Sequence, residues 1–439
     1  MNKVLKIAAI VPAICCLFMS IAFAGEIDLL VQKLVEKGVL TPGEAQQIVT
    51  ETREEVKKEI AQGKSESLPS WVQNIKFKGD FRMRYQWENR DGSNLNVGKT
   101  NDRNRERIRL RFGAEAKAND KAKVYLGLAT GENGDPRSTN VTLTDLFSKK
   151  SIYLDYAYGD YQIANWLWLA AGRMKNPIWE PGDMLWDTDI NPEGGAAKFN
   201  FNLKDWAPNL EVYANTGIYS LYENSNGSDA FMYVLQPGFK WGVTPDINVN
   251  FANSVYGFHK LKGTTVSFSG KSNTPAPNAP AGLSSSQNFY KFNFNSVNPN
   301  LEISFNEPFK LLHIEMPSLL KVLEVPYLSL YSEYVNNLDA DFSKSGWASG
   351  IRFGTAKVAN KGDWQARYQY TMLGTNAWPD VFPDSDRYGG RTGIRGHEFE
   401  FTYGLGKNLN FNLDYYMTNL TSSDLNTENL LQADLNWKF

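Results

Sequence analysis

From about residue 71 to its C-terminus, the chain alternates apolar and polar residues at every second position. In the first such segment, Phe81, Met83 and Tyr85 alternate with Arg82 and Arg84. Successive side chains of a β-strand point to opposite faces, so this period predicts strands with one apolar and one polar face. The same alternation recurs at 198–203, 364–372 and 409–417. This part of the chain is therefore predicted to be all-β, although a soluble β-sandwich would show the same period.

Three features favour a transmembrane antiparallel β-barrel over a sandwich. Apolar bands such as 108–116 extend over about 9 to 11 residues, as a tilted membrane strand requires. Aromatic residues gather at strand ends, where interfacial girdles form, as at Tyr85, Trp87 and Trp437. Short turns alternate with long polar loops, the pattern of periplasmic turns and extracellular loops. The turns are 118–121, 204–208, 360–362 and 406–407, and the loops are 89–102, 131–150, 175–194, 258–286 and 375–394.

The N-terminus is typical of a secretory signal peptide. An apolar run, residues 7–23, follows Lys3 and Lys6 and ends in Ala22-Phe23-Ala24, which predicts cleavage after Ala24. Residues 1–24 would therefore be absent from the mature protein.

Charge and cysteine content exclude several classes of function. Both cysteines, Cys15 and Cys16, lie in the signal peptide, so the mature chain would have no disulfide and no thiolate metal site. The chain has 46 basic and 48 acidic residues, a near-balance that gives no sign of nucleic-acid binding. His259, His313 and His397 have neither metal-ligand spacing nor a Ser-His-acid arrangement. The sequence thus predicts no metal, no cofactor and no enzyme activity.

Residues 25–70 differ from the rest and are expected to form a short α-helical hairpin followed by a polar linker at 63–70. The second helix has a clear start, with Thr41 as N-cap, Pro42 in the first helical position and Glu44 completing a capping box. Both helices carry a heptad-like apolar stripe. We expect a periplasmic helical hairpin, with self-association through these stripes as the alternative, and the barrel at 71–439.

The last strand ends on an outward aromatic residue, Phe439. This ending resembles that of Gram-negative outer-membrane proteins, in which a C-terminal Phe is read by the barrel-assembly machinery. The segments 172–177 and 186–194 resemble the "putative porin" family, whose members carry a short helical region after the signal peptide. The resemblance covers about residues 71–439 and implies a channel in the outer-membrane lipid of a Gram-negative bacterium.

The number of strands depends on residues 290–315. If Tyr290–Phe294 and Leu301–Phe305 form one bent strand with a bulge near Pro299, the barrel has 16 strands. If a turn lies there and another strand covers 309–315, it has 18. We favour 16, because 18 requires an unusually tight extracellular turn at Glu307-Pro308. Either number leaves an aqueous lumen.

Arginine occupies every second position of one strand, so five guanidinium groups leave the same face. Facing lipid, each would cost about 2 to 4 kcal/mol near the bilayer midplane, so this face must line the lumen. Pairing Glu88 with Arg103 would set Arg84 beside Arg107 and Arg82 beside Arg109. We call these residues the arginine ladder: Arg82, Arg84, Arg103, Arg105, Arg107, Arg109 and Arg111. The charge of the ladder either selects anions or only keeps the lumen wall hydrated, without selectivity.

The third long loop carries five acids: Glu180, Asp183, Asp187, Asp189 and Glu193. In trimeric general porins the third loop folds into the barrel and presents acids opposite a basic wall. That resemblance implies that these acids face the ladder, and that the chain forms a homotrimer; a solvated surface loop is the alternative. Acids of the last long loop, Asp380, Asp384 and Asp386, are expected to be solvated surface residues.

Together these features predict an outer-membrane porin for passive diffusion of small hydrophilic solutes, favouring anions. The alternative is a structural barrel that anchors the periplasmic helices to a partner or to the cell wall. Inward bulky residues would favour the anchor, whereas the many inward Asn, Gln, Asp and Arg residues favour a channel.

Overall fold

The structure is a computed structural model of the chain. It describes residues 35, 40, 41, 43–48, 50, 51, 54, 74–90, 102–132, 135–225, 227–264, 272–274, 289–311 and 325–439, without the side chains of 423–426. Contacts divide the chain into two units, Met1–Gln73 and Asn74–Phe439. No helix in the described part of the chain has the length and hydropathy of a membrane span.

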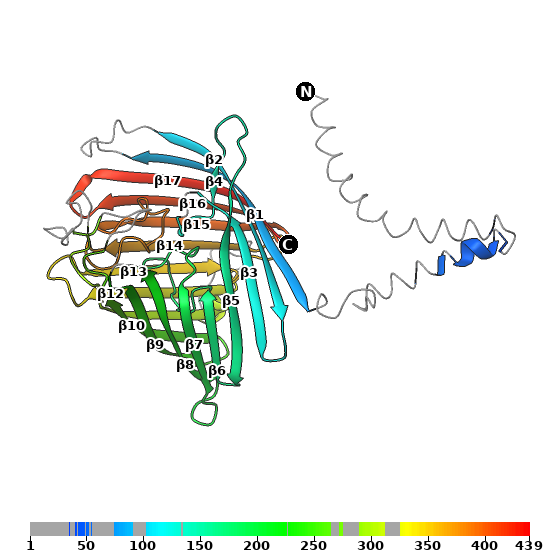
Figure 1. Cartoon of the computed structure of the whole chain (residues 1–439), viewed down its shortest axis with the longest axis horizontal. Coiled ribbons are helices and arrows are strands. Elements are labelled where there is room, and N and C mark those ends of the chain that lie inside the picture. The colour runs from blue at the N-terminus through cyan, green and yellow to red at the C-terminus, as the bar shows by residue number, and fades with distance from the viewer. Residues whose placement is uncertain are drawn as a thin grey trace. The chain divides into compact units, whose positions relative to one another are not determined.

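The second unit is one antiparallel sheet that closes on itself (Figure 1). Strand β1 pairs with β2 on one side and with β17 on the other, so no edge remains open. β4 has two residues and pairs beside β2, and the remaining sixteen strands form the barrel. The strands are β1 Ile75–Arg90, β2 Arg103–Lys117, β3 Ala122–Thr130, β4 Val141–Thr142, β5 Ile152–Ala164, β6 Leu167–Arg173, β7 Glu193–Asn202, β8 Leu210–Tyr222, β9 Ala230–Gly242, β10 Ile247–His259, β11 Ser296–Asn306, β12 Tyr327–Asn337, β13 Ser345–Gly354, β14 Trp364–Leu373, β15 Ile394–Gly406, β16 Leu409–Leu420 and β17 Ser423–Lys438.

The prediction of 16 strands is confirmed, but its reasoning at 290–305 was wrong in one detail. β11 begins at Ser296, and Tyr290 makes only an isolated bridge, so 290–294 belong to the loop before the strand. The start of the segment expected to be an eighteenth strand is a short helix, α6 Pro308–Leu311. Residues 312–324 lie outside the described part of the chain.

The two faces of the wall follow the alternation in the sequence. Apolar side chains on the outer face are exposed, with Phe77 at 61% and Met83 at 47%, as expected for a surface that contacts lipid. On the inner face Arg84 is 4% and Gln86 is 2% exposed. Water-exposed apolar side chains in this number would be costly, so the outer face is matched to a membrane.

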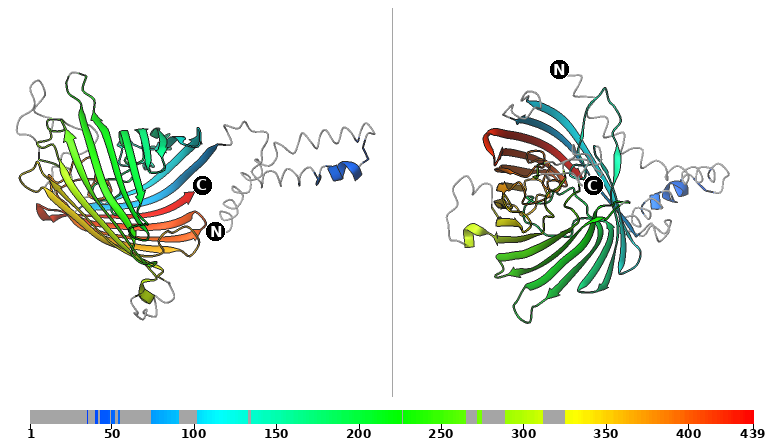
Figure 2. Two further views of the ribbon diagram at one scale, coloured as in Figure 1. Left: turned by 90° about the horizontal axis from the view of Figure 1, so that it is seen from below. Right: turned by 60° about the vertical axis from the view of Figure 1, so that its left-hand side comes forward.

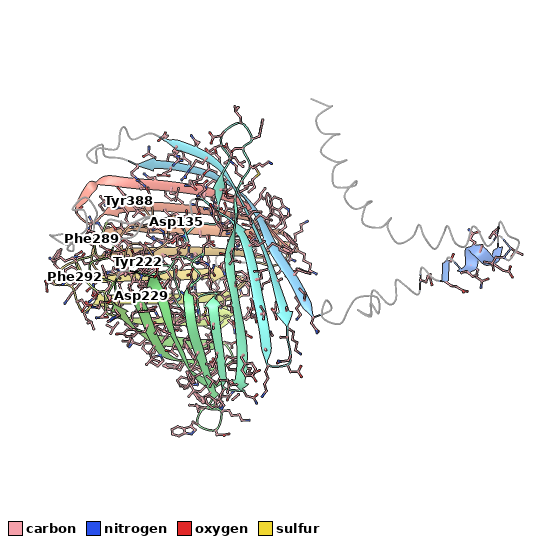
Figure 3. All side chains as sticks on the ribbon, in the orientation of Figure 1. Asp135, Tyr222, Asp229, Phe289, Phe292 and Tyr388 are labelled. Carbon is pink, nitrogen blue, oxygen red and sulfur yellow. The ribbon has the colours of Figure 1, made fainter. Side chains whose placement is uncertain are left out.

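Most long connections gather at one end of the barrel and most short turns at the other. Asp135, Asp229, Phe292 and Tyr388, from four different long-end loops, all lie in the left half of the barrel in Figure 3. An exception at the short-turn end is the connection 307–326, which contains α6. The expected proline-rich tip at 275–280 lies outside the described residues.

Two loops fold into the barrel and pack against each other (Figure 2, right). They are the third loop, residues 174–192, and the β14–β15 loop, residues 374–393. Trp378 is fully buried; its indole N–H donates to Leu185 O at 2.9 Å, and its ring lies 4.7 Å from that of Tyr256 on β10. Trp186 adds a second indole, 5.9 Å from Trp378. Trp186, Trp378 and the apolar residues packed around them fill part of the lumen, and we call this cluster the apolar plug. Any solute path therefore lies beside the plug.

The described part of the first unit includes the predicted helix start. Thr41 N donates to Glu44 Oε2 at 2.9 Å, and Glu44 N donates to Thr41 Oγ1 at 3.4 Å, as in a capping box. Residues 43–48 are helical. The predicted signal peptide, the predicted first helix apart from Val35, and the predicted linker lie outside the described residues.

Candidate functional site

The arginine ladder lies on the inner wall of β1 and β2 in the expected register. Arg84 is opposite Arg107, Arg82 is opposite Arg109, and Glu88 is opposite Arg103. Like charges at this spacing repel each other, so the wall requires carboxylates, anions or water to be stable.

Carboxylates on β1 and on the adjacent strand β17 neutralise much of the positive charge of the ladder. Asp80 on β1 accepts from Arg109 Nη2 at 2.7 Å and from Arg111 Nε at 2.9 Å. Asp434 on β17 forms a two-point contact with Arg84, at 2.7 and 2.9 Å. These acids share the inward parity of the arginines, so the strand pattern already placed them in the lumen.

Arg107 differs from its neighbours. Its guanidinium donates to Gln86 Oε1 at 3.1 Å, Asn140 O at 3.3 Å and Ser138 Oγ at 3.4 Å, all of them uncharged acceptors. Among the described residues no carboxylate lies within ion-pair distance of it. Arg107 is 7% exposed, and Asp386 and Glu132 act on its positive charge from beyond ion-pair distance.

Only one of the five third-loop acids contacts the ladder. Asp189 lies 3.1 Å from Arg111 Nη1, and it also accepts from Thr139 N at 3.0 Å. Burial alone would raise the pKa of Asp189, but Arg111 and Arg109 hold it below its ordinary value. Asp189 is therefore the third-loop acid that lies against the basic wall.

The other four acids lie elsewhere, so the expectation that all five face the ladder was wrong. Asp187 is buried and accepts from Ser385 N at 2.9 Å. Burial, with repulsion from Asp384 and Asp189, raises the pKa of Asp187. Glu180 accepts from the Tyr256 hydroxyl at 3.3 Å, and Glu193 on β7 pairs with Arg173.

Asp183 instead reaches a second basic group on the opposite side of the site. It lies 3.1 Å from Arg367 on β14 and 3.3 Å from Arg387 in the β14–β15 loop, and it accepts from Gln369 at 2.7 Å. Both arginines also pair with Glu398 on β15. Although burial opposes ionisation, Arg367 and Arg387 lower the pKa of Asp183. These ion pairs fix the third loop to the wall.

The acids of the β14–β15 loop are not solvated surface residues, contrary to expectation. Asp380 is fully buried and accepts from Tyr290 Oη at 2.9 Å and from Asn273 N at 3.0 Å. Asp386 lies 3.2 Å from Arg84 Nη1. Burial raises the pKa of Asp386, but Arg84 and Arg107 outweigh it and lower the pKa. Nothing in the local sequence signals that this loop folds inward.

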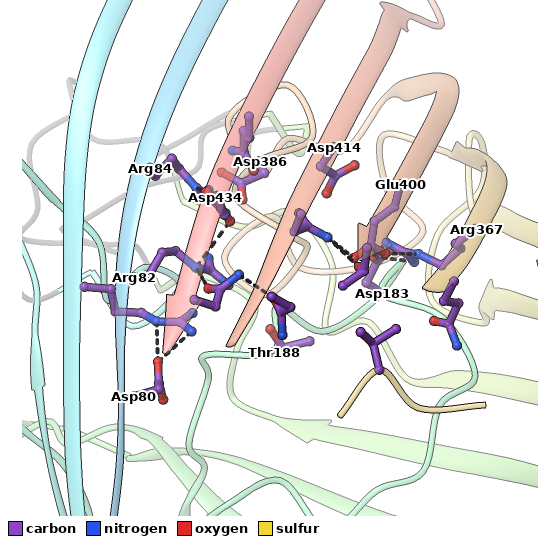
Figure 4. Close-up of a pocket in the computed structure, with 18 of the residues that line it drawn as sticks. Asp80, Arg82, Arg84, Asp183, Thr188, Arg367, Asp386, Glu400, Asp414 and Asp434 are labelled. Atoms are coloured by element: carbon purple, nitrogen blue, oxygen red, sulfur yellow. Dashed lines mark hydrogen bonds and ion pairs between the residues drawn. The ribbon is translucent and has the colours of Figure 1, made fainter. Parts of the chain in front are cut away.

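Two charged cavities lie in series along the ladder. The first, of about 540 Å³, is lined by Arg82, Arg84, Arg109 and Arg111 among others (Figure 4). The second, of about 530 Å³, is lined by Arg105 and Arg107. Asp386 lines both, so the Arg84–Asp386 ion pair lies at the junction of the two cavities.

The lining of the first cavity is formally neutral. Seven arginine and lysine side chains face seven aspartate and glutamate side chains. The two signs of charge are interleaved: Asp80 on β1 and Asp434 on β17 pair with ladder arginines, and Glu400 on β15 pairs with Arg367 on β14. A solute in this cavity meets both signs of charge.

The remaining candidates show no site of another kind. The described residues contain no group of three or more His, Cys, Asp or Glu that could hold a metal ion. His397 exchanges a hydrogen bond with Tyr368 Oη at 2.9 Å, His259 is exposed, and His313 lies outside the described part.

A family model described as "Putative porin" matches residues 45–99 and 95–439. The chain belongs to this family. It is therefore an outer-membrane channel for passive diffusion and not an enzyme. A comparison with curated proteins found no match.

Three solved structures are similar to this chain. Pseudomonas putida OprB aligns with a TM-score of 0.52 at 10% identity, covering 87% of this chain and 97% of OprB. Salmonella typhi OmpF aligns at 0.45 with 10% identity, covering 83% and 97% of the two chains. Acinetobacter baumannii DcaP aligns at 0.42 with 12% identity, again covering 83% and 97%. At these identities the likeness to OprB supports the porin fold alone.

The end of this porin's chain joins the barrel seam. Phe439 N donates to Gly79 O at 3.0 Å, and Gly79 N donates to Phe439 O at 2.8 Å, so the terminal residue extends the pairing of β17 with β1. Its side chain is 61% exposed on the outer face. This placement suits a recognition signal, but the role in assembly stays a prediction.

Proposed function

We propose that this porin passes small hydrophilic solutes along the β1–β2 wall and favours anions there. The observation that supports the proposal most is Arg107, a buried cation on the second cavity that has no carboxylate within ion-pair distance in the described part of the chain. A fixed charge in a narrow, low-dielectric channel raises the local concentration of ions of the opposite sign.

The lining of the first cavity carries equal numbers of basic and acidic side chains, which limits the preference for anions. This preference should depend on pH, because an acid in the lining has a shifted pKa. Burial, and repulsion from Asp386 and Asp183, raise the pKa of Asp384, which lines this cavity. A carboxyl with a raised pKa takes up a proton at a higher pH than an exposed one, so the lining becomes more positive as the pH falls.

The test is the reversal potential of the purified barrel in a planar bilayer under a salt gradient. Replacing Arg107 with Gln removes a positive charge without leaving a carboxylate unpaired, so the barrel should fold as before. The anion-to-cation permeability ratio should fall, and most at low salt, where the Debye length is about 30 Å at 0.01 M against about 10 Å at 0.1 M.

Two variants control this measurement. Arg107→Lys should keep the parent's ratio, because the charge remains. Lys240→Gln removes a cation that lines a separate cavity and lies over the ring of Tyr213, so its ratio should also stay near that of the parent. If Arg107→Gln folds and matches the parent at low salt, the ladder does not select anions.

The polar cavities favour a channel over a purely structural anchor, although an apolar plug occupies part of the lumen. Three further features stay predictions. These are the homotrimer, recognition of Phe439 by the barrel-assembly machinery, and the periplasmic position of residues 25–70, with cleavage after residue 24 and a barrel that begins at 71.

A further inference from the structure

We propose that the first cavity binds small zwitterionic solutes, with an ammonium group at Asp414 and a carboxylate at Arg82. The proposal rests on the proposed function only in requiring that this cavity lies on an open solute path. It adds a solute class and a binding site to a channel whose anion preference is a separate matter.

Asp414 on β16 is a buried carboxyl group with one oxygen that has no hydrogen-bond partner among the described residues. It is 9% exposed and lines the cavity, and its Oδ1 makes no hydrogen bond among the described residues. Its wall neighbours are Glu400 and Gln432. Glu400 already accepts from Arg367 and Asn412. A buried carboxylate that lacks compensation is costly, so a bound ammonium group would relieve that cost.

A second carboxylate oxygen in the same cavity has the same property. Asp384 Oδ2 is buried and unpartnered within the described residues, although Asp384 Oδ1 accepts from Asp386 N at 3.0 Å. Each of these two oxygens can accept a hydrogen bond from an ammonium group. The cavity therefore offers acceptors for an amine as well as cations for an anion.

Arg82 on β1 supplies the opposite charge. Its Nε makes both of its polar contacts, with Asn436 Oδ1 at 2.8 Å and with Asp434 Oδ2 at 3.3 Å. The two Nη groups have no hydrogen-bond partner among the described residues, and the side chain is 19% exposed in the cavity. Guanidinium groups bind carboxylates with good geometry, so Arg82 can hold the acidic end of a solute. Figure 4 shows Arg82 and Asp414 projecting from different strands into the same cavity.

The experiment measures how 4-aminobutyrate reduces the single-channel current of the full barrel in a planar bilayer. Butyrate, which lacks the ammonium group, and butylammonium, which lacks the carboxylate, are the matched probes. We expect a saturable reduction by 4-aminobutyrate at concentrations where neither probe acts. Asp414→Asn and Arg82→Gln should each weaken its apparent affinity by about 10- to 100-fold, the usual contribution of a charge-assisted hydrogen bond.

Glu302→Gln is the matched control, because Glu302 also faces the lumen but lines a separate cavity and pairs with Arg352. It should leave the effect of 4-aminobutyrate unchanged. Heat-modifiable migration checks that each variant folds, and Asp414→Asn preserves the side-chain shape if Arg82→Gln does not fold.

Equal action of butyrate or butylammonium would overturn the proposal, and so would an unchanged affinity in folded Asp414→Asn. A barrel that conducts ions but ignores 4-aminobutyrate contradicts this proposal alone, whereas a barrel without conductance contradicts the proposed function.

Discussion

Arg84 and Arg107 are cross-strand neighbours with opposite surroundings. Arg84 holds Asp434 and Asp386, whereas Arg107 contacts only uncharged acceptors. Removing one partner of a buried ion pair costs about 3 to 5 kcal/mol, because the other charge remains buried alone. Substitution of Arg84 therefore tests stability and selectivity together, while substitution of Arg107 tests selectivity alone.

The pH dependence of selectivity should report on Asp384. Burial, with repulsion from Asp386 and Asp183, raises its pKa well above 3.8, so it takes up a proton at a higher pH than an exposed aspartate. The first cavity then loses a negative charge as the pH falls. The anion-to-cation permeability ratio should therefore start to rise at a higher pH than the titration of ordinary carboxylates, at about pH 4, would cause. Reversal potentials measured over a series of falling pH values follow the rise.

The variant Asp384→Asn should show a smaller rise, because its side chain is neutral at every pH. Asp205→Asn, in an exposed turn, should behave like the parent. A rise of equal size in Asp384→Asn and the parent would show that other carboxyls are responsible.

Residues on strands were more predictable than residues on loops. The positions of Arg82 to Arg111 followed from parity and register, and Asp80, Asp414 and Asp434 could have been found by the same rule. The ion pairs of Asp183 and Asp386 could not, because they depend on how two long loops fold over each other. No periodicity in those loops encodes that packing.

The ring of the last residue, Phe439, packs against β1 at Gly79, which has no side chain. A Cβ at this position would lie 2.6 Å from the Phe439 ring and 2.7 Å from Arg111 O. Gly79→Ala should therefore displace the terminal ring and cost about 1 to 3 kcal/mol, as overpacking usually does. The yield of folded, heat-modifiable barrel should fall.

Gly159→Ala is a suitable comparison, since a Cβ there would be 3.7 Å from Lys123 O, an ordinary contact. Its yield should match that of the parent. If both variants fold equally well, the close packing of the Phe439 ring against Gly79 is not needed for assembly.

The strands themselves were well determined by the sequence, because a membrane allows only a closed sheet with an apolar exterior. The exception was the boundary near Ser296, where apolar residues 290–294 continue the alternation outside the strand. Three aromatic residues of this segment, Tyr290, Phe292 and Phe294, are buried in the apolar plug. Their alternation with polar residues therefore comes from burial against the inward-folded loops and not from a membrane strand.

For the molecule as a whole, the apolar plug sets how much of the lumen is open. Trp378→Ala would leave a cavity where the two inward loops meet β10, at a cost of about 3 to 5 kcal/mol to loop packing. The strands do not depend on this contact, so the barrel should still form. Single-channel recordings should show a larger and noisier conductance than the parent.

Trp206→Ala removes an indole that is 89% exposed in a short turn, and its conductance should equal that of the parent. Unchanged conductance and noise in Trp378→Ala would mean that the plug does not limit the pore.

The seam between β1 and β17 also has a consequence for how the chain is made. Arg84 and Asp434 are 350 residues apart in the chain, yet their contact crosses this seam. Closure of such a sheet has to wait until the last strand is available, because both neighbours of β1 are needed. A chain interrupted during synthesis or cut by a protease keeps two open edges, which favours aggregation over insertion. The Arg84–Asp434 ion pair can therefore form only in a chain that is intact from β1 to β17.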